Sequence, residues 1–279
     1  MAEPPLLTSI DGVITPSAEA LLPLPDDGFF RGDGVFEVLR SYSGHLFALG
    51  EHLDRLEASA AALDLRVERD SVEAEAAALM DRLMENGKSG SSEVAPGGGP
   101  DCLLRIIFTR AGRRVLTSER LPVHPGSVTL ATVEYSPSVI LNGVKSLSYA
   151  ANMQATRMAK ESGADEALLV TVGGIVLEPP TSTLFWVSAD GPLRTTGIGA
   201  GVLESITRRK VIERCEVETG HFDIGDVIAA SEAFLASTTR EIQPVHAIDA
   251  KPVPSTPAPR TAEAARAFAE ALAEELRGA

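Results

Sequence analysis

The sequence contains very little cysteine, only Cys102 and Cys215 in 279 residues. Two cysteines cannot form a framework of several disulfides. Neither lies in a CxxC or Cys/His pattern with the spacing of zinc ligands, so no metal site is expected. This cysteine usage favours a reducing compartment.

Positive charge and long apolar runs are also scarce. The chain has 25 Lys and Arg against 39 Asp and Glu, a formal net charge of −14. Because the basic residues are dispersed, we expect no nucleic-acid binding. The apolar runs are too short to span a bilayer, and the N-terminus lacks the pattern of a secretory signal. We therefore expect a cytoplasmic protein with no membrane partner.

The pattern of apolar residues predicts a mixed α/β chain. A length of 279 residues with 44% hydrophobic content allows one large domain or two modest ones. The Ser-Pro-Ser and Asn-Gly pairs favour a linker at 135–143, between a small domain, 1–134, and a large domain, 144–279. Helices are expected over 51–64, 71–86, 150–162, 205–219 and the C-terminus, strands over 35–40, 45–49, 103–109, 127–133, 166–172, 183–187 and 233–237, and a Gly/Ser-rich loop over 87–100.

Lys145 lies in an unusual setting for a lysine, in Val-Lys-Ser-Leu-Ser-Tyr between a turn and a predicted helix start. Most lysines are solvated surface charges. A partly buried ammonium has a lowered pKa, which a Schiff-base lysine requires. Tyr149, four residues later, can place a phenol beside such a group.

Glu178 follows the apolar residues 174–177 and precedes two prolines. A carboxylate beside an apolar sheet needs a partner, either an arginine or a protonated heterocyclic nitrogen. The hydroxyl-rich helix start at Ser205 and the cluster at 237–239 are either plain caps or phosphate sites. With Lys145 they supply an amine, a pyridinium partner and a phosphate cradle, the three functions that pyridoxal 5′-phosphate (PLP) requires.

Six ordered blocks extend these features over nearly the whole chain. They are Asp33-Gly34-Val35-Phe36-Glu37 with His52-Leu53-x-Arg55-Leu56-x-x-Ser59, Lys145-Ser-Leu-Ser-Tyr149-x-x-Asn152, Ala159-x-x-x-Gly163-Ala164-Asp165-Glu166-Ala167, Glu178-x-x-x-Ser182, Leu203-x-x-Ile206-Thr207-Arg208, and Ser237-Thr238-Thr239-x-Glu241-Ile242-x-Pro244-Val245. The set resembles the class IV aminotransferases, which are PLP enzymes of fold type IV. The resemblance implies an α/β (α+β) fold with a small N-terminal domain, a larger C-terminal domain with a barrel-like sheet, and PLP between them. It also implies a homodimer.

The same resemblance implies roles for individual residues. Lys145 holds PLP as a Schiff base and moves the proton, while Glu178 keeps the pyridine nitrogen protonated. Tyr149 contacts the ring 3-oxygen. The phosphate is assigned to Arg55, Thr238 and the backbone N–H groups of Ile206 and Thr207, one ring face to Leu203, and substrate contacts to Arg31, Phe36, Arg110 and Thr239.

The sequence departs from the family pattern in three places. Thr183 replaces an asparagine, and Pro179-Pro180 replaces small residues. The connection 135–145 is short, so the strand expected to begin the large domain is missing or replaced. We expect this departure to affect the order of the sheet and not the cofactor residues.

The activity implied is amino transfer between a small amino acid and a keto acid such as 2-oxoglutarate or pyruvate. Val-Phe-Glu-Val and the block at 237–245 favour the D-amino acid type over branched-chain L-amino acid aminotransferase and aminodeoxychorismate lyase. Arg31 and Arg110 are the predicted carboxylate ligands, with Arg40 a third candidate, although strand-end arginines are often surface charges. A non-catalytic PLP-binding or metabolite-binding protein is the least favoured alternative, because Lys145 and Glu178 are both present.

Overall fold

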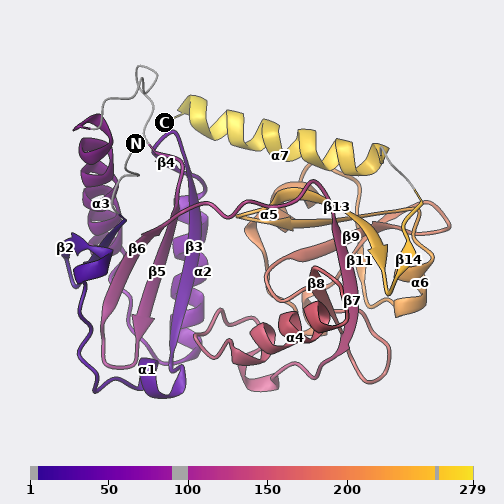
Figure 1. The fold of residues 1–279 in the computed structure, drawn as a ribbon, viewed down its shortest axis with the longest axis horizontal. Helices are drawn as coiled ribbons and strands as arrows, with labels where there is room; N and C mark the ends of the chain where they lie inside the picture. Colours follow the sequence, from indigo (N-terminus) through magenta and orange to yellow (C-terminus); the bar gives the residue numbers. More distant parts are fainter. Residues whose placement is uncertain (1–5, 90–99, 255–257, 279) are drawn as a thin grey trace. The chain divides into compact units, whose positions relative to one another are not determined.

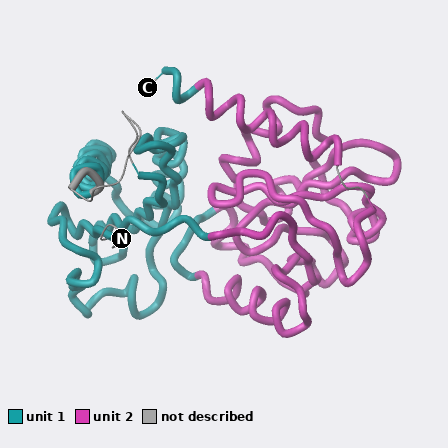
Figure 2. The backbone as a smooth tube through the Cα atoms, turned by 45° about the horizontal axis from the view of Figure 1, so that its top comes forward, with its two compact units in different colours: residues 1–122, 144–148, 275–279 teal, residues 123–143, 149–274 magenta. Residues whose placement is uncertain are grey.

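The computed structural model describes residues 6–89, 100–254 and 258–278 (Figure 1). Backbone contacts divide the chain into two compact units, coloured in Figure 2. Unit 1 comprises 1–122, 144–148 and 275–279, and unit 2 comprises 123–143 and 149–274.

Unit 1 is built on one antiparallel sheet. Its strand order is β2-β1-β6-β5-β3-β4. The strands are β1 (Leu7–Ile10), β2 (Val13–Pro16), β3 (Gly34–Tyr42), β4 (His45–Leu46), β5 (Leu103–Thr109) and β6 (Arg114–Glu119). The helices are η1 (Ser17–Glu19), α1 (Asp27–Arg31), α2 (Leu49–Ala62) and α3 (Arg69–Ser89).

The core of unit 1 lies between this sheet and helices α2 and α3 (Figure 1). Successive residues of a strand point to opposite faces, so Val35 and Leu39 of β3 face the same way. Both are fully buried against the helices, together with Leu53 and Leu56 of α2.

Unit 2 is built on a mixed sheet of eight strands, in the order β11-β10-β9-β12-β13-β7-β8, with β14 paired to β13. Its parallel pairs are β10 with β11, β13 with β7, and β7 with β8. The strands are β7 (Val128–Glu134), β8 (Glu166–Val170), β9 (Thr183–Val187), β10 (Leu193–Thr196), β11 (Glu218–Gly220), β12 (Glu232–Ser237), β13 (Glu241–Ile248) and β14 (Lys251–Pro252). The helices are η2 (Val139–Leu141), α4 (Ala150–Glu161), η3 (Ile198–Ala200), α5 (Ile206–Ile212), α6 (Ile224–Ile228) and α7 (Pro259–Gly278).

The central strands of unit 2 are buried on both faces. Every residue of β9 and β12 is buried. Phe185 and Phe234 stack with ring centroids 5.0 Å apart on one face, where Val211 of α5 also packs. Trp186 points to the other face and donates to Asp226 at 2.7 Å. A strand covered on both sides appears in the sequence as a continuous apolar run, which is why 183–187 and 233–237 were predictable.

The structure corrects one predicted helix. Residues 205–219 form only the short helix α5, which ends at Ile212, and Glu218–Gly220 forms β11. Parallel pairing with β10 decides this ending, because a tertiary contact outweighs the weak local preference for helix. Strands β6, β10 and β13 were also absent from the prediction; β13 contains Pro244, which argues locally against a strand.

The connection between 135 and 143 contains η2 and is short, yet the second sheet has its parallel strand β7 directly before it. Since β7 pairs with β8 and β13, backbone contacts group it with unit 2. The predicted linker at 135–143 follows this strand, and the domain boundaries stay a prediction. Of the predicted loop 87–100, residues 87–89 complete α3 and 90–99 lie outside the described residues.

Gly34, the first residue of β3, provides a test of this packing. A Cβ there would lie 2.3 Å from the backbone oxygen of Phe108 and 2.7 Å from Leu147 Cδ1. Because that oxygen belongs to the β3–β5 ladder, we expect Gly34→Ala to lower the free energy of unfolding by about 2 kcal/mol. Urea unfolding measures this change. Gly126→Ala is the control, since nothing lies within 4 Å of its added Cβ; equal midpoints for the two variants would contradict the packing.

Candidate active site

The backbone of Lys145 is held by two elements of unit 1. Its carbonyl accepts a hydrogen bond from Phe36 N at 3.0 Å, and Leu147 N donates to Gly34 O at 2.8 Å. Residues 145–147 thereby extend the sheet beside the start of β3. Lys145 N also donates to Ser59 Oγ of α2 at 3.2 Å. Strand and helix together determine where the lysine side chain begins.

The amine of Lys145 lies over an aromatic ring. Its Nζ is 4.4 Å from the centroid of Phe36, a buried residue of β3. A ring face attracts an ammonium, but it also replaces water that would otherwise solvate the charge. The structure therefore brings together Lys145 and Phe36, two residues that the sequence assigned to cofactor and substrate.

Arg55 lies in a buried cluster with Glu37 of β3 and His52 of α2. Its Nε and Nη2 donate to the two oxygens of Glu37 at 2.7 Å each, and His52 Nδ1 is 2.7 Å from Glu37 Oε2. Burial would raise the pKa of Glu37, but the Arg55 charge and the hydrogen bonds from both neighbours lower it to about 2. Burial lowers the pKa of His52, against the opposing effect of Glu37. The cluster therefore holds an ionised Glu37 and a neutral His52.

Glu37 and His52 belong to the sequence blocks described above, in which they have no predicted role. The sequence nevertheless contains a pattern that indicates their pairing. Glu37 alternates with Val35 and Leu39 on one face of a strand, and His52 and Arg55 are three residues apart on a helix. A carboxylate on an apolar face requires such partners.

Unit 2 brings Glu178 together with Leu203, as Leu203 N donates to Glu178 Oε1 at 2.8 Å. Arg208 of α5 lies near enough for the Glu178 charge to act on it. Burial lowers the pKa of Arg208, while Glu178 and Glu204 oppose this effect. Arg208 Nη2 donates to Thr196 O at 3.1 Å, which ties α5 to β10.

The segment after Glu178 is joined to Tyr149, the residue before α4. The Tyr149 hydroxyl donates to Pro180 O. Within residues 6–89, 100–254 and 258–278, the buried hydroxyls of Ser182 and Thr183 have no hydrogen-bond partner. Buried polar atoms are almost always paired, so this turn fits a bound group that offers further hydrogen bonds.

The residues assigned to the phosphate in unit 2 lie at two turns. Ile206 and Thr207 begin α5, where Ser205 Oγ caps the helix by accepting from Arg208 N at 3.3 Å. The first N–H groups of a helix have no acceptor inside the helix, which favours an anion there. Thr238 lies in the turn between β12 and β13 with Thr239, whose Oγ1 is 3.3 Å from His124 Nε2.

The two predicted substrate arginines have different surroundings. Arg31, at the end of α1, is 76% exposed and pairs with Asp27 at 3.3 Å. The guanidinium of Arg110 makes four hydrogen bonds among the described residues, two to the carboxylate of Asp33 and one each to the carbonyls of Leu63 and Asp64. These two carbonyls follow the end of α2, so Arg110 caps that helix.

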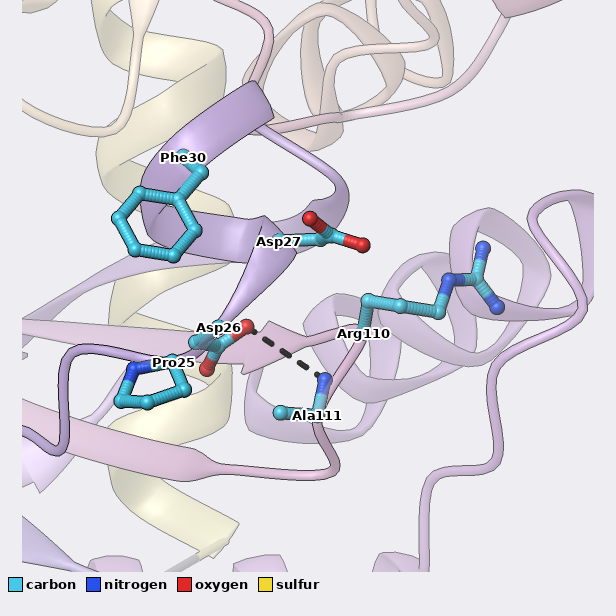
Figure 3. Close-up of a pocket in the computed structure, with 6 residues that line it drawn as sticks. All are labelled: Pro25, Asp26, Asp27, Phe30, Arg110 and Ala111. Carbon is cyan, nitrogen blue, oxygen red and sulfur yellow. Dashed lines mark hydrogen bonds between the residues drawn. The ribbon is translucent and has the colours of Figure 1, made fainter.

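Arg110 is one of the residues that line a hollow of about 310 Å³. Figure 3 shows its guanidinium directed away from Asp26. The hollow is also lined by Pro25, Asp27, Phe30 and Ala111. Asp26 Oδ2 accepts from Thr109 Oγ1 at 2.5 Å. A carboxylate ligand in this hollow would therefore be attracted by Arg110 and repelled by Asp26 and Asp27.

Comparison with known proteins identifies the family. The model of the amino-transferase class IV family matches residues 34–248. The chain belongs to this family. D-alanine aminotransferase of Listeria innocua is 32% identical over 83% of each chain, and a putative branched-chain-amino-acid aminotransferase of Methanocaldococcus jannaschii is 28% identical over 87% of this chain and 88% of the relative.

Solved structures of the same fold align with this chain. The fold IV-transaminase CpuTA1 of Curtobacterium pusillum aligns with a TM-score of 0.81 and 25% identity, over 95% of this chain and 99% of the other. The PLP-bound form of a hypothetical aminotransferase from Mycobacterium tuberculosis aligns with a TM-score of 0.84 at 22% identity, over 96% and 99%. The predicted family, the α/β fold of type IV and the enzyme class, a PLP-dependent aminotransferase, are confirmed.

The residues of this aminotransferase fit PLP. They include an amine beside an aromatic ring, a carboxylate beside Leu203, and two buried hydroxyls without partners in the described part of the chain. The roles of the individual residues, the homodimer and the cytoplasmic location stay predictions. No helix among the described residues is long and apolar enough to cross a membrane.

The buried cluster leads to a prediction about acid stability. A group whose pKa is lower in the folded state contributes stability above its unfolded pKa and loses it as the pH falls. The contribution of Glu37 should disappear from its ordinary value of 4.5 down to about 2, and that of His52 should decline below 6.5. We expect the melting temperature to fall from pH 6.5 downward and more steeply below pH 4.5.

Melting curves of Glu37→Gln at several pH values measure how much of this fall in melting temperature is due to the Glu37 carboxyl. This variant should melt lower at pH 7, because a buried charge loses its partner, and should show a flatter decline below pH 4.5. Glu85→Gln, on the exposed side of α3, is the control. An unchanged slope in Glu37→Gln would contradict the assignment.

Proposed function

We propose that this aminotransferase transfers amino groups between a small amino acid, with D-amino acids favoured, and a keto acid such as 2-oxoglutarate or pyruvate. The observation that carries the proposal is the position of Lys145, whose backbone is held by β3 and α2 while its amine lies 4.4 Å from the Phe36 ring centre. The D-type preference is supported by the blocks at 35–38 and 237–245 and by the 32% identity to a D-alanine aminotransferase.

PLP, when bound, supplies a reactive aldehyde and a ring that delocalises the electrons left on the substrate α-carbon. We propose that Lys145 Nζ binds the cofactor and moves the proton from the substrate α-carbon. The ring of Phe36, whose centroid is 4.4 Å from Nζ, orients the amine that moves this proton. Glu178 keeps the pyridine nitrogen protonated, and Leu203 N holds the Glu178 carboxylate in place at 2.8 Å.

The other residues proposed to contact PLP bind it and fix its orientation. Tyr149 contacts the ring 3-oxygen, and its hydroxyl is placed by Pro180 O. Leu203 covers one ring face. The phosphate contacts are Arg55, Ile206 N, Thr207 N and Thr238.

Substrate carboxylates are proposed to bind Arg31 and Arg110, with Phe36 and Thr239 as further substrate contacts. Arg31 is accessible to a ligand because its side chain is 76% exposed. Four donors of Arg110 are engaged within unit 1, so its replacement removes a helix cap as well as a proposed contact. The two arginines therefore require separate tests.

The first test is a panel of half-reactions followed by visible absorption. D-alanine and D-glutamate should bleach the cofactor absorption of the wild type, while L-leucine leaves it unchanged. Lys145→Ala should lose this absorption and lower turnover by a factor on the order of 10² to 10⁴, the usual contribution of an acid–base group. Lys160→Ala, an exposed residue of α4, is the control.

The panel also separates the alternatives. Reaction with L-leucine and not with D-alanine would indicate the branched-chain type. Release of pyruvate and p-aminobenzoate from aminodeoxychorismate would indicate the lyase. Bound cofactor that no substrate bleaches would indicate a non-catalytic protein, and full activity of Lys145→Ala would contradict the role of that amine.

The substrate arginines are tested by steady-state kinetics with dicarboxylic keto acids. Arg31→Ala and Arg110→Ala should each raise the Michaelis constant about tenfold, the size of one charge-assisted contact. Arg110→Ala should also lower the melting temperature, and Arg31→Ala should not. Arg66→Ala, exposed in the same unit, is the control. An unchanged constant in both variants would refute this proposal.

A further inference from the structure

Glu37 is a charged residue in an apolar environment, and the proposed mechanism does not use it. It lies on the helix-facing side of β3 between Val35 and Leu39, and all three are fully buried. A buried ion pair adds little net stability, since apolar residues of similar volume often replace one without loss. Stability alone therefore does not explain why a carboxylate occupies this buried position.

The contact between Glu37 and Arg55 fixes the orientation of the Arg55 guanidinium. Nε and Nη2 of Arg55 each donate at 2.7 Å to a different oxygen of Glu37. Two parallel bonds fix the plane of a guanidinium, which a single contact does not do. Glu37 is fully buried while Arg55 is 14% exposed, so Arg55 lies at the edge of the cluster.

His52 holds Glu37 from the other side. Its Nδ1 is 2.7 Å from Glu37 Oε2, and its side chain is 2% exposed. A neutral imidazole at this position donates from Nδ1, because an ionised carboxylate only accepts. His52 therefore restrains one oxygen of the carboxylate that restrains Arg55.

A single face of α2 carries all of these contacts. His52, Arg55 and Ser59 are spaced three and four residues apart, which places them on one side of a helix. Ser59 accepts the hydrogen bond from Lys145 N. The helix face that orients Arg55 therefore also holds the backbone of the proposed catalytic lysine.

We propose that Glu37 is a positioning residue for the cofactor phosphate, which orients the Arg55 guanidinium, and that His52 supports Glu37 in this role. The inference rests on the proposed function, in which Arg55 contacts the phosphate of PLP. It adds a buried carboxylate and a neutral histidine to the parts of the protein that determine phosphate binding.

The experiment compares two ligands that differ only in the phosphate. Apoenzyme prepared from the holoenzyme is titrated with PLP and with pyridoxal, which lacks the phosphate, and visible absorption gives each dissociation constant. In Glu37→Gln, PLP affinity should fall about 10-fold to 100-fold, the usual effect of losing a residue that orients a ligand-binding group. Pyridoxal affinity should stay within about twofold, since the change acts only through the phosphate.

Two further variants test the chain of contacts. His52→Leu should reproduce part of the selective loss, whereas His52→Asn should restore PLP affinity, because its amide can donate from the place of Nδ1. Glu57→Gln changes an α2 carboxylate that is 39% exposed and pairs with Arg69, and it should change neither constant. Because each variant is judged by the ratio of two affinities, a general loss of folded protein affects both ligands equally and does not imitate the result.

The outcomes separate this inference from the proposed function. Equal losses for PLP and pyridoxal in Glu37→Gln, or no loss for either, would overturn the positioning role. Arg55→Ala should show the same selectivity as Glu37→Gln, and the double variant should add little to it. If Arg55→Ala leaves PLP affinity unchanged, the phosphate assignment is wrong as well; failure of the wild type to bind PLP would contradict the proposed function itself.

Discussion

Strand β3 carries contacts of three kinds because a strand presents alternate side chains to opposite faces and its backbone to both edges. Val35 and Leu39 form the core with α2, and Glu37, on the same face, reaches Arg55. Phe36 points to the other face and lies beside the amine of Lys145. Along one edge, residues 145–147 bond to the start of the strand, so the position of β3 determines that of the lysine.

The buried charges of unit 1 follow from the same geometry. Glu37 cannot leave the apolar face without a shift in strand register that would also expose Val35 and Leu39. Its charge is compatible with burial because Arg55 and His52 lie opposite on α2. A chain with a net charge of −14 thus binds one of its arginines to a buried carboxylate, where the arginine is held in a defined orientation.

In unit 2, buried strands hold the residues that are assigned to the cofactor. Strands β9 and β12 are covered on both faces, and the segments that flank them carry the residues assigned to the cofactor. Glu178 lies before β9, and Thr238 lies in the turn after β12. Short turns at the ends of rigid strands place side chains more reproducibly than long loops do. The bond from Leu203 N to Glu178 joins a third turn to this group.

Local patterns were enough to predict helix α4 and strands β3, β5, β9 and β12, because apolar periodicity acts over a few residues. Strand β11 and the end of α5 depend on pairing with β10, a contact between distant residues that no local pattern reveals. The same is true of Arg110, whose guanidinium binds Asp33 and the end of α2, and of Arg55 with Glu37. The order of residues along the chain was enough to recognise the family and the residue types available for chemistry. The partner of each charge depends on the folded chain, because a charge pairs with the groups that folding brings within a few ångströms of it.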